Sequence, residues 1–297
     1  MNNEKTPSSI KTSSKKEQQK SSNIVTPRCD LIFKRIFGSE ENKDILRSFL
    51  SAVLDLPPED IKTLTIKDPH FIPKYKDKKL RILDIKIETS GNQIIDIEMQ
   101  RAMHIYLRDR IVRYNAQLIS EQQTVENDYK LRRAKTIVIA DFNLLPEETS
   151  YFSRYRMKNV INGNEFSDAI EYNILEIRKM PKTSDQSPLY EWLKFLRIEN
   201  EEDVMEMKPS FPEIQKAIEE LRRICSNPED REKYAAEEKA LTDYLTDVHG
   251  NYLVGHEKGQ YSILRKMHEN GLSEQTIAEY TSLPLEDVKR ILKNGNA

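Results

Sequence analysis

The sequence feature that most constrains the fold is a stretch of strict alternation at residues 80–101. Apolar residues keep one parity on each side of the turn signal Ser90-Gly91-Asn92. They are Leu83, Ile85 and Ile87 before it and Ile95, Ile97 and Met99 after it. Period-2 alternation on both sides of a turn predicts two half-buried strands joined as a hairpin.

The length of the turn sets which residues of the hairpin face each other. With a three-residue loop, Asp84 faces Glu98, Lys86 faces Asp96, and Gln100 follows on the same face as Glu98. A slip of one residue would move every side chain to the opposite face, so this register is a specific prediction.

The predicted polar face brings the carboxylates of Asp84 and Glu98 together with the amide of Gln100. Directly opposed Cβ atoms lie about 4.5–5.5 Å apart, and two carboxylates at that distance repel each other. A divalent cation that prefers oxygen ligands would relieve the repulsion. A solvated outer face of an amphipathic hairpin, with Lys86 and Asp96 as a surface pair, explains the same pattern, and the residues alone leave both interpretations open.

The order of these residues resembles a known family. Asp84, then Glu98-x-Gln100, follows a helical segment with the pattern Asp30-x-x-Phe-Lys34-x-x-Phe-Gly. This resembles the PD-(D/E)XK nuclease superfamily, and most closely its recombination-promoting nuclease/putative transposase branch, in which Gln often replaces the motif lysine. The resemblance runs from about residue 26 to the end of the chain. It implies an α/β fold with a restriction-endonuclease-like core, in which helices flank a mixed central sheet, followed by an all-helical C-terminal region.

The resemblance also implies an activity, namely metal-dependent hydrolysis of DNA phosphodiester bonds. Asp84, Glu98 and the backbone carbonyl of Met99 would hold Mg²⁺ (or Mn²⁺), and Gln100 would orient the attacking water. Glutamine carries no positive charge and no titratable proton, so this departure from the lysine form bears on the rate more than on the fold.

Four further residues are candidates for a supporting role. Asp30 and Lys34 are four apart on one helix face, which is compatible with an exposed ion pair or with support of the site. Arg110 and Tyr114, in a helix expected at residues 103–123, match an Arg-x-x-x-Tyr pattern of the family. A guanidinium at this place would bind substrate phosphate, although a solvated helix surface explains the pattern as well.

Composition limits the other possibilities for this chain of 297 residues. The formal net charge is −2 and charged residues make up 32%, so no overall positive field indicates nucleic acid. The cysteines, Cys29 and Cys225, match no metal-binding spacing and indicate a reducing compartment. No apolar run approaches the ~18 residues of a membrane helix, and the basic N-terminus lacks the apolar stretch of a secretory signal. These features predict a cytoplasmic protein without membrane contact.

Composition shifts divide the chain into four parts. We expect a disordered basic tail at residues 1–25, the nuclease-like core at 26–182, a helical extension at 183–260 and a helix-turn-helix-like module at 261–297. Within the core, Thr26-Pro27 predicts a helix start, and strands are expected at 61–66, 134–142 and 172–177. In the extension, a helix is expected at 230–250, with Gly255 and Gly259 loosening its connection to the C-terminal module.

The C-terminal module bears on the choice between functions. Ser273 is the expected N-cap of its first helix, and its second helix starts with Leu285-Glu286-Asp287, which would repel phosphate. This favours a packing or dimerising module over a reader of DNA bases, and a homodimer through the C-terminal helices is expected. The alternative to a nuclease is a catalytically weak or inactive scaffold that acts through protein or nucleic-acid binding.

Overall fold

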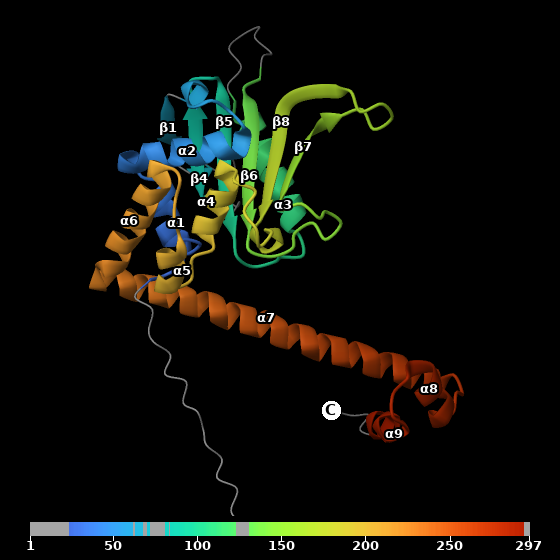
Figure 1. Ribbon diagram of the computed structural model, residues 1–297. Helices are drawn as coiled ribbons and strands as arrows, with labels where there is room; N and C mark the ends of the chain where they lie inside the picture. The colour runs from blue at the N-terminus through green and yellow to red at the C-terminus, as the bar shows by residue number, and fades with distance from the viewer. Residues whose placement is uncertain are drawn as a thin grey trace, which may run out of the picture.

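The computed structural model places a mixed six-stranded sheet at the centre of the core (Figure 1). It describes residues 24–61, 63–67, 70–71, 81–82, 84–122 and 131–293. The strands are β1 (Leu64–Lys67), β2 (His70–Phe71), β3 (Arg81–Ile82), β4 (Ile85–Thr89), β5 (Gln93–Gln100), β6 (Arg133–Ala140), β7 (Phe152–Lys158) and β8 (Glu165–Glu176). The sheet order is β1-β4-β5-β6-β8-β7, with β6 parallel to both β5 and β8 and the other pairs antiparallel, while β2 and β3 form a separate ribbon.

Helices cover both faces of this sheet, and the last ones extend beyond it. They are α1 (Asp30–Phe37), α2 (Lys43–Leu54), α3 (Leu107–Ser120), α4 (Pro188–Leu196), α5 (Glu201–Glu206), α6 (Pro212–Ser226), α7 (Pro228–Glu269), α8 (Glu274–Thr281) and α9 (Leu285–Lys293). Short 3₁₀ turns are η1 (Glu40–Asn42), η2 (Pro58–Ile61) and η3 (Ile177–Lys179). Helices α1, α2, α4 and α6 share the main apolar core with one face of the sheet, and α3 packs on the other face (Figure 1).

The predicted hairpin and its register are confirmed where the structure describes them. In β4 and β5, Ile85 pairs with Ile97, Lys86 with Asp96, and Thr89 with Gln93, which leaves Ser90-Gly91-Asn92 as the loop. Asn92 adopts a left-handed conformation with φ of 57°. A short polar side chain tolerates this conformation, which closes the loop. Leu83, which belongs to the alternating pattern, lies outside the described residues.

Several expected boundaries in the core are wrong, each for a local reason. Thr26 and Pro27 do not start the first helix: the amide of Cys29 donates to the Thr26 carbonyl in a turn, and α1 begins at Asp30. Helix α3 is shorter than the expected span of residues 103–123 and begins at Leu107. The expected strand at 172–177 is the inner end of the longer β8, and β7 was not predicted. Strand β7 is mostly exposed, so its sequence lacks the alternation that burial of one face would impose.

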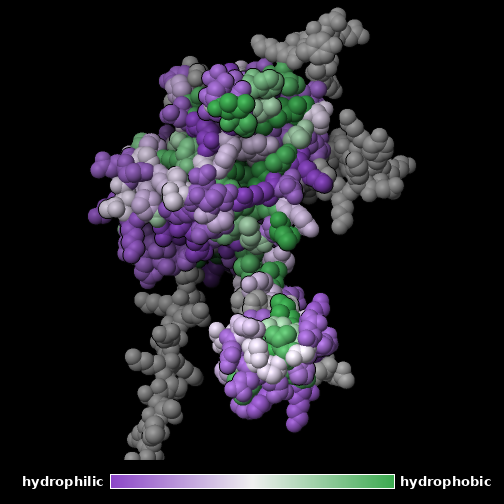
Figure 2. Space-filling view, turned by 90° about the vertical axis from the view of Figure 1, so that its right-hand side faces the viewer, coloured by the Kyte–Doolittle hydropathy of each residue, from purple (hydrophilic) through white to green (hydrophobic). Residues whose placement is uncertain are grey.

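The hairpin of β7 and β8 projects from the sheet and carries exposed apolar side chains. Val160, Ile161 and Phe166 are 100%, 91% and 80% exposed. Figure 2, which faces the side toward which this hairpin and α7 point, shows apolar surface gathered in this region.

Helix α7 contradicts the expected loosening after residue 250. It runs without interruption for 42 residues, or about 63 Å at about 1.5 Å per residue. Its N-terminal part lies against the core, from Asp230, which pairs with Arg35 at 2.5 Å, to Tyr244, which contacts His104, and the remainder projects away from the core (Figure 1). At its far end α8 and α9 pack around Leu264 and Ile277, and Ser273 caps α8 as predicted.

The glycines inside α7 offer a test of this continuous helix. At Gly255 and Gly259 an added Cβ would meet no atom within 4 Å, so alanine fits. We expect Gly255→Ala and Gly259→Ala each to stabilise this part of the helix by about 0.8–1 kcal/mol. Hydrogen exchange should slow at amides of the second half of α7 and stay unchanged in the sheet. Unchanged or faster exchange in α7 would contradict a continuous helix.

The structure also bears on the predictions for membrane helices, for two strands and for the division of the chain. No helix among the described residues is both long and apolar enough to cross a membrane. The strand expected at residues 61–66 is β1, slightly displaced, and that at 134–142 is β6. Most of the expected tail lies outside the described residues, and the four-part division stays a prediction.

Candidate active site

The two predicted carboxylates lie next to each other where β4 and β5 meet. Asp84 directly precedes β4, and its Oδ2 accepts a hydrogen bond of 2.7 Å from the amide of Met99. Glu98 precedes Met99 in β5, so this bond holds the Asp84 carboxylate beside Glu98. The hairpin register thus produces the juxtaposition that the sequence predicted.

The polar face of the hairpin is buried, so the interpretation as a solvated face is wrong for its centre. Asp96 is 0% and Glu98 4% exposed. The cause is α3, which crosses this face and packs through Leu118 on Ile94 and through Leu107 and Ile111 on β6. Sequence alternation shows that a face is polar, but it does not show whether a helix covers it.

Burial leaves carboxylate oxygens in this cluster without hydrogen bonds. Both oxygens of Asp96 and the Oε1 of Glu98 accept none from the described residues. Burial, together with the charges of Asp96 and Asp84, raises the pKa of Glu98 well above its ordinary value. The pKa of Asp96 is likewise raised, first by burial and then by the charge of Asp84. A buried carboxylate without a donor or a cation is costly to ionise, so the cluster is suited to a positive ligand.

Lys34 is the side chain that approaches the cluster from α1. Its Nζ lies 2.9 Å from Asp30 and 3.4 Å from Asp84. Burial raises the pKa of Asp84 to about 6, although the charge of Lys34 opposes the shift. Burial lowers the pKa of Lys34, but the carboxylates of Asp84 and Asp30 outweigh it, so that this pKa is raised overall. Asp30 and Lys34 are therefore more than an exposed pair along one helix, because they extend to the carboxylate of Asp84.

Gln100 connects the acidic cluster with α3. Its Nε2 donates to the Oε2 of Glu98 at 3.1 Å, and its Oε1 accepts from the Nη2 of Arg110. The guanidinium of Arg110 lies 6.0 Å from the centre of the Tyr114 ring, which fits a cation–π contact. The charge of Arg110 also lowers the pKa of Glu98, against the larger effect of burial. The structure therefore brings Arg110 and Tyr114 to the predicted cluster.

Helix α7 borders this region, which the sequence did not indicate. Glu238 forms a bidentate pair with Arg101, the residue after Gln100, and the Nη2–Oε2 distance is 2.9 Å. Further along α7, the hydroxyl of Tyr244 lies 3.1 Å from the Nδ1 of His104. No sequence signal could have found these contacts, because they join residues about 140 positions apart.

Asp96 is the residue of the cluster that sequence reasoning left out. One of the two interpretations of the polar face made it the surface partner of Lys86. The ammonium of Lys86 lies 3.3 Å from Glu121, and its charge lowers the pKa of Asp96 against the larger effect of burial. The available signal was its parity, since Asp96, Glu98 and Gln100 alternate along one face of β5. Glu88, on the polar face of β4, is not part of the cluster and pairs with Lys67 and Arg132.

The oxygen ligands of the cluster fit a divalent cation that binds few protein groups and keeps several waters. Among the described residues, no three His, Cys, Asp or Glu side chains are arranged so that they could hold a metal ion. Two carboxylates, a backbone carbonyl and water oxygens are nevertheless a sufficient set for Mg²⁺, which usually keeps several waters. The oxygen of Glu98 without a hydrogen bond supports this fit. Asp84, Glu98 and the Met99 carbonyl as ligands stay a prediction.

Fold and site together define a class of protein. A mixed sheet with helices on both faces, and two carboxylates side by side on neighbouring strands, is the architecture of the PD-(D/E)XK nuclease fold. The sequence profile of the family described as PD-(D/E)XK nuclease family transposase matches residues 27–251. The chain therefore belongs to this family, which confirms the resemblance and the predicted fold class. Comparisons with curated proteins and with solved structures gave no match.

The contact between Lys34 and Asp84 predicts a pH-dependent effect. Without the ammonium, the pKa of Asp84 rises further above about 6, and protons compete better with a cation for this carboxylate. We expect Lys34→Met, at limiting Mg²⁺, to lower the DNA cleavage proposed below about tenfold at pH 6 and much less at pH 8.5.

A pH–rate profile of both proteins checks this expectation. Lys34→Arg, which keeps the charge, serves as the matched control and should keep the acid limb of the wild type. A loss of activity by the same factor at every pH would instead assign Lys34 a role that does not involve the ionisation of Asp84.

Proposed function

We propose that the chain is a metal-dependent DNA endonuclease of the recombination-promoting, transposase-associated type. Family membership supports a nuclease-type function. The observation that carries the finer proposal is the buried pair of Asp84 and Glu98, with an unsatisfied oxygen on Glu98 and two cationic side chains at its edges. Such an arrangement suits phosphodiester hydrolysis, because the carboxylates can hold a cation and the flanking side chains add positive charge where a negatively charged phosphate would bind.

Asp84, Glu98 and the carbonyl of Met99 would hold Mg²⁺ or Mn²⁺. The ion, when bound, would supply charge stabilisation at the scissile phosphate and a water of lowered pKa. Members of the family typically use divalent metals, which supports this choice. The raised pKa of Glu98 implies that the ion and protons compete for the same carboxylate.

The side chains around the acidic pair have roles that follow from their chemistry. The amide of Gln100 has a second lone pair on its oxygen and a second N–H, so it can orient water while it stays bonded to Arg110 and Glu98. Arg110 is half-buried and supplies the positive charge that Gln100 lacks. In the proposed reaction Arg110 would bind a phosphate oxygen.

The site opens on one side, from which the substrate would approach. The side chain of Asp84 is 16% exposed and those of Lys34 and Asp30 are 33% and 47% exposed, whereas Glu98 is buried. A phosphodiester arriving from the α1 side would thus meet Lys34 and Asp84 before Glu98.

DNA is the proposed substrate because the family is one of nuclease-type transposases. The C-terminal module adds no support for base reading. In α9, Lys289 pairs with Glu286 at 3.2 Å and Arg290 pairs with Asp287 at 2.8 Å, so the basic residues are partly neutralised within the helix. The homodimer through the C-terminal helices and the cytoplasmic location stay predictions.

The alternative function is a nuclease-fold scaffold with weak or no catalysis, acting through protein or nucleic-acid binding. The observation that favours it is the replacement of the motif lysine by Gln100. In such a scaffold Asp84 and Glu98 would be present, but the protein would cleave DNA weakly or not at all.

Cleavage of supercoiled plasmid separates the two functions. Wild-type protein, shown to be folded by circular dichroism, is incubated with plasmid and Mg²⁺, Mn²⁺ or EDTA. Nicked or linear plasmid with either metal and none with EDTA supports the endonuclease. Intact plasmid under all three conditions, from folded protein, supports the scaffold.

A further inference from the structure

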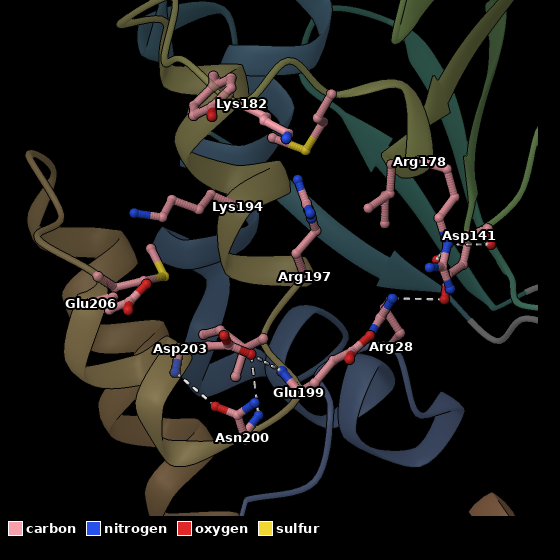
Figure 3. Close-up of a pocket in the computed structure, with 15 residues that line it drawn as sticks. Arg28, Asp141, Arg178, Lys182, Lys194, Arg197, Glu199, Asn200, Asp203 and Glu206 are labelled. Carbon is pink, nitrogen blue, oxygen red and sulfur yellow. Dashed lines mark hydrogen bonds and ion pairs between the residues drawn. The ribbon is translucent and has the colours of Figure 1, made fainter.

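A cavity of about 660 Å³ lies beside α4 and α5, at the carboxyl ends of β6 and β8 (Figure 3). It is separate from the acidic cluster but near it in the sheet. Asp141, at its edge, directly follows β6, and its amide donates to the carbonyl of Gln100 at 2.9 Å. Cavities of this size are typical of small-molecule sites.

Most acidic groups around the cavity already have partners. Arg28 lies 2.7 Å from both Asp141 and Glu199, and Arg178 also lies 2.7 Å from Asp141. Asp203 accepts hydrogen bonds from the backbone amides of Glu199 and Asn200, as part of the cap of α5. The charge of Arg197 also contributes, after the hydrogen bond from Arg28, to the lowered pKa of Glu199. Glu206, the fourth acidic residue of the lining, is exposed. The acids around the cavity therefore offset its other cations only in part.

Three of these cations form no ion pair with the described residues. They are Lys182, Lys194 and Arg197, and all three are exposed. Figure 3 shows Arg197 extending into the hollow from the end of α4, with Lys182 above it, and Lys194 toward the side on which Glu206 lies. Like charges that converge on a concave surface repel each other and favour an anion.

The floor of the cavity includes apolar side chains, which distinguishes it from an ordinary solvated patch of lysines. Ile177, Met180, Ile198 and Met207 line it and are at most 8% exposed. The ring of Tyr190, whose hydroxyl donates to the carbonyl of Pro181, adds an aromatic surface. A ligand that matches both features combines a compact anion with an apolar or aromatic part.

We propose that this cavity binds a nucleotide, with the phosphate group on Lys182 and Arg197, Lys194 at the rim, and the sugar and base against the apolar floor. The nucleotide is either free or the 5′-phosphorylated end of a DNA strand. If the ligand is the end of a DNA strand, this inference rests on the proposed function, because the cavity would then bind a second phosphate of the same substrate. Binding itself requires neither a divalent ion nor cleavage.

Titration calorimetry with the full chain in EDTA tests the proposal. The probes are 2′-deoxyadenosine 5′-monophosphate, inorganic phosphate and uncharged 2′-deoxyadenosine. We expect the monophosphate to bind more tightly than phosphate alone, and the nucleoside to bind much more weakly than either. The double variant Lys182→Gln/Arg197→Gln should weaken binding of the monophosphate at least about tenfold, because it removes two charged contacts.

Two further variants show whether the cavity is the binding site. Lys158→Gln, an exposed lysine of β7 that does not line the cavity, is the matched control and should bind as the wild type does. Asp84→Asn should also leave binding unchanged. No binding by the wild type, equal binding by the double variant, or a loss of binding in Asp84→Asn would overturn the proposal.

Fluorescence anisotropy in EDTA distinguishes the two sources of the nucleotide. A 5′-phosphorylated oligonucleotide that binds more tightly than its 5′-hydroxyl counterpart, with the difference lost in the double variant, assigns the strand end. Equal binding of the two oligonucleotides, together with binding of the monophosphate, assigns a free nucleotide. Plasmid cleavage is measured separately. A protein that does not cleave plasmid could still bind the nucleotide, and a protein that does not bind the nucleotide could still cleave plasmid.

Discussion

Metal-dependent nicking of plasmid is expected to fall at least about 10³-fold in both Asp84→Asn and Glu98→Gln, because each removes one of the two carboxylates proposed to hold the ion. The amides are close in size to the acids they replace. The side-chain amide introduced by Asp84→Asn would keep an oxygen that accepts from the backbone amide of Met99, so the hairpin should stay intact. The measurement is the rate of loss of supercoiled plasmid in Mg²⁺ and in Mn²⁺.

Glu88→Gln is the matched control for these variants. Glu88 also lies on β4, but its carboxylate pairs with Lys67 and Arg132 away from the cluster. It should therefore cleave at close to the wild-type rate. Nicking that persists in both Asp84→Asn and Glu98→Gln would place the activity at another site or in a contaminant.

The second large effect concerns stability. Asp96→Asn is expected to stabilise the metal-free protein at pH 7.5 by about 2 kcal/mol, or about 4–8 °C in Tm, because it removes a buried carboxyl group whose ionisation is opposed by burial and only partly favoured by the charge of Lys86. Thermal unfolding in EDTA measures the change. A lower Tm in the variant would mean that the Asp96 carboxylate contributes a stabilising interaction.

The effect of Asp96→Asn on stability is expected to depend on pH. Burial raises the pKa of Asp96 in the folded protein, and an unfolded aspartate titrates near about 3.9. Between these two values the folded state holds a proton that the unfolded state has released, so stability falls as the pH rises. Asp84, with a pKa of about 6, and Glu98 act in the same direction. The wild type should therefore lose stability on going from pH 5 to pH 8, and Asp96→Asn should lose less.

Asp44, which forms an ion pair and has a lowered pKa, provides a control in which stability depends on pH in the opposite direction. Burial raises the pKa of Asp44, but the ion pair with Lys216 outweighs it and lowers this pKa overall. Its contribution to stability is thus present above the unfolded pKa and is lost as the pH falls. Asp44→Asn should leave the Tm at pH 7.5 unchanged or slightly lower. A rise equal to that of Asp96→Asn would indicate a general effect of lowering the negative charge.

The sequence determined the hairpin and, with it, the two central residues of the site. Alternation with period 2 places side chains on alternate faces, and the length of Ser90-Gly91-Asn92 sets the register, so the adjacency of Asp84 and Glu98 follows from local rules. The predicted N-cap Ser273 likewise marks the start of α8.

Other features depended on contacts between segments that are distant in sequence. Helix α3 buries Asp96 and Glu98, and the packing of α1 on the sheet brings Lys34 to Asp84. These arrangements depend on how helices dock on the two faces of a sheet, which the periodicity of any one segment does not encode.

The cavity beside α4 and α5 has the same origin. Its charges come from separate segments, and Arg28 pairs with two of the acidic side chains that line it, Asp141 and Glu199. Local sequence thus determined which residues face together on the hairpin. Only the tertiary structure decided which of them are buried, which are neutralised and which remain charged and open to a ligand, because burial and pairing depend on neighbours from the whole chain.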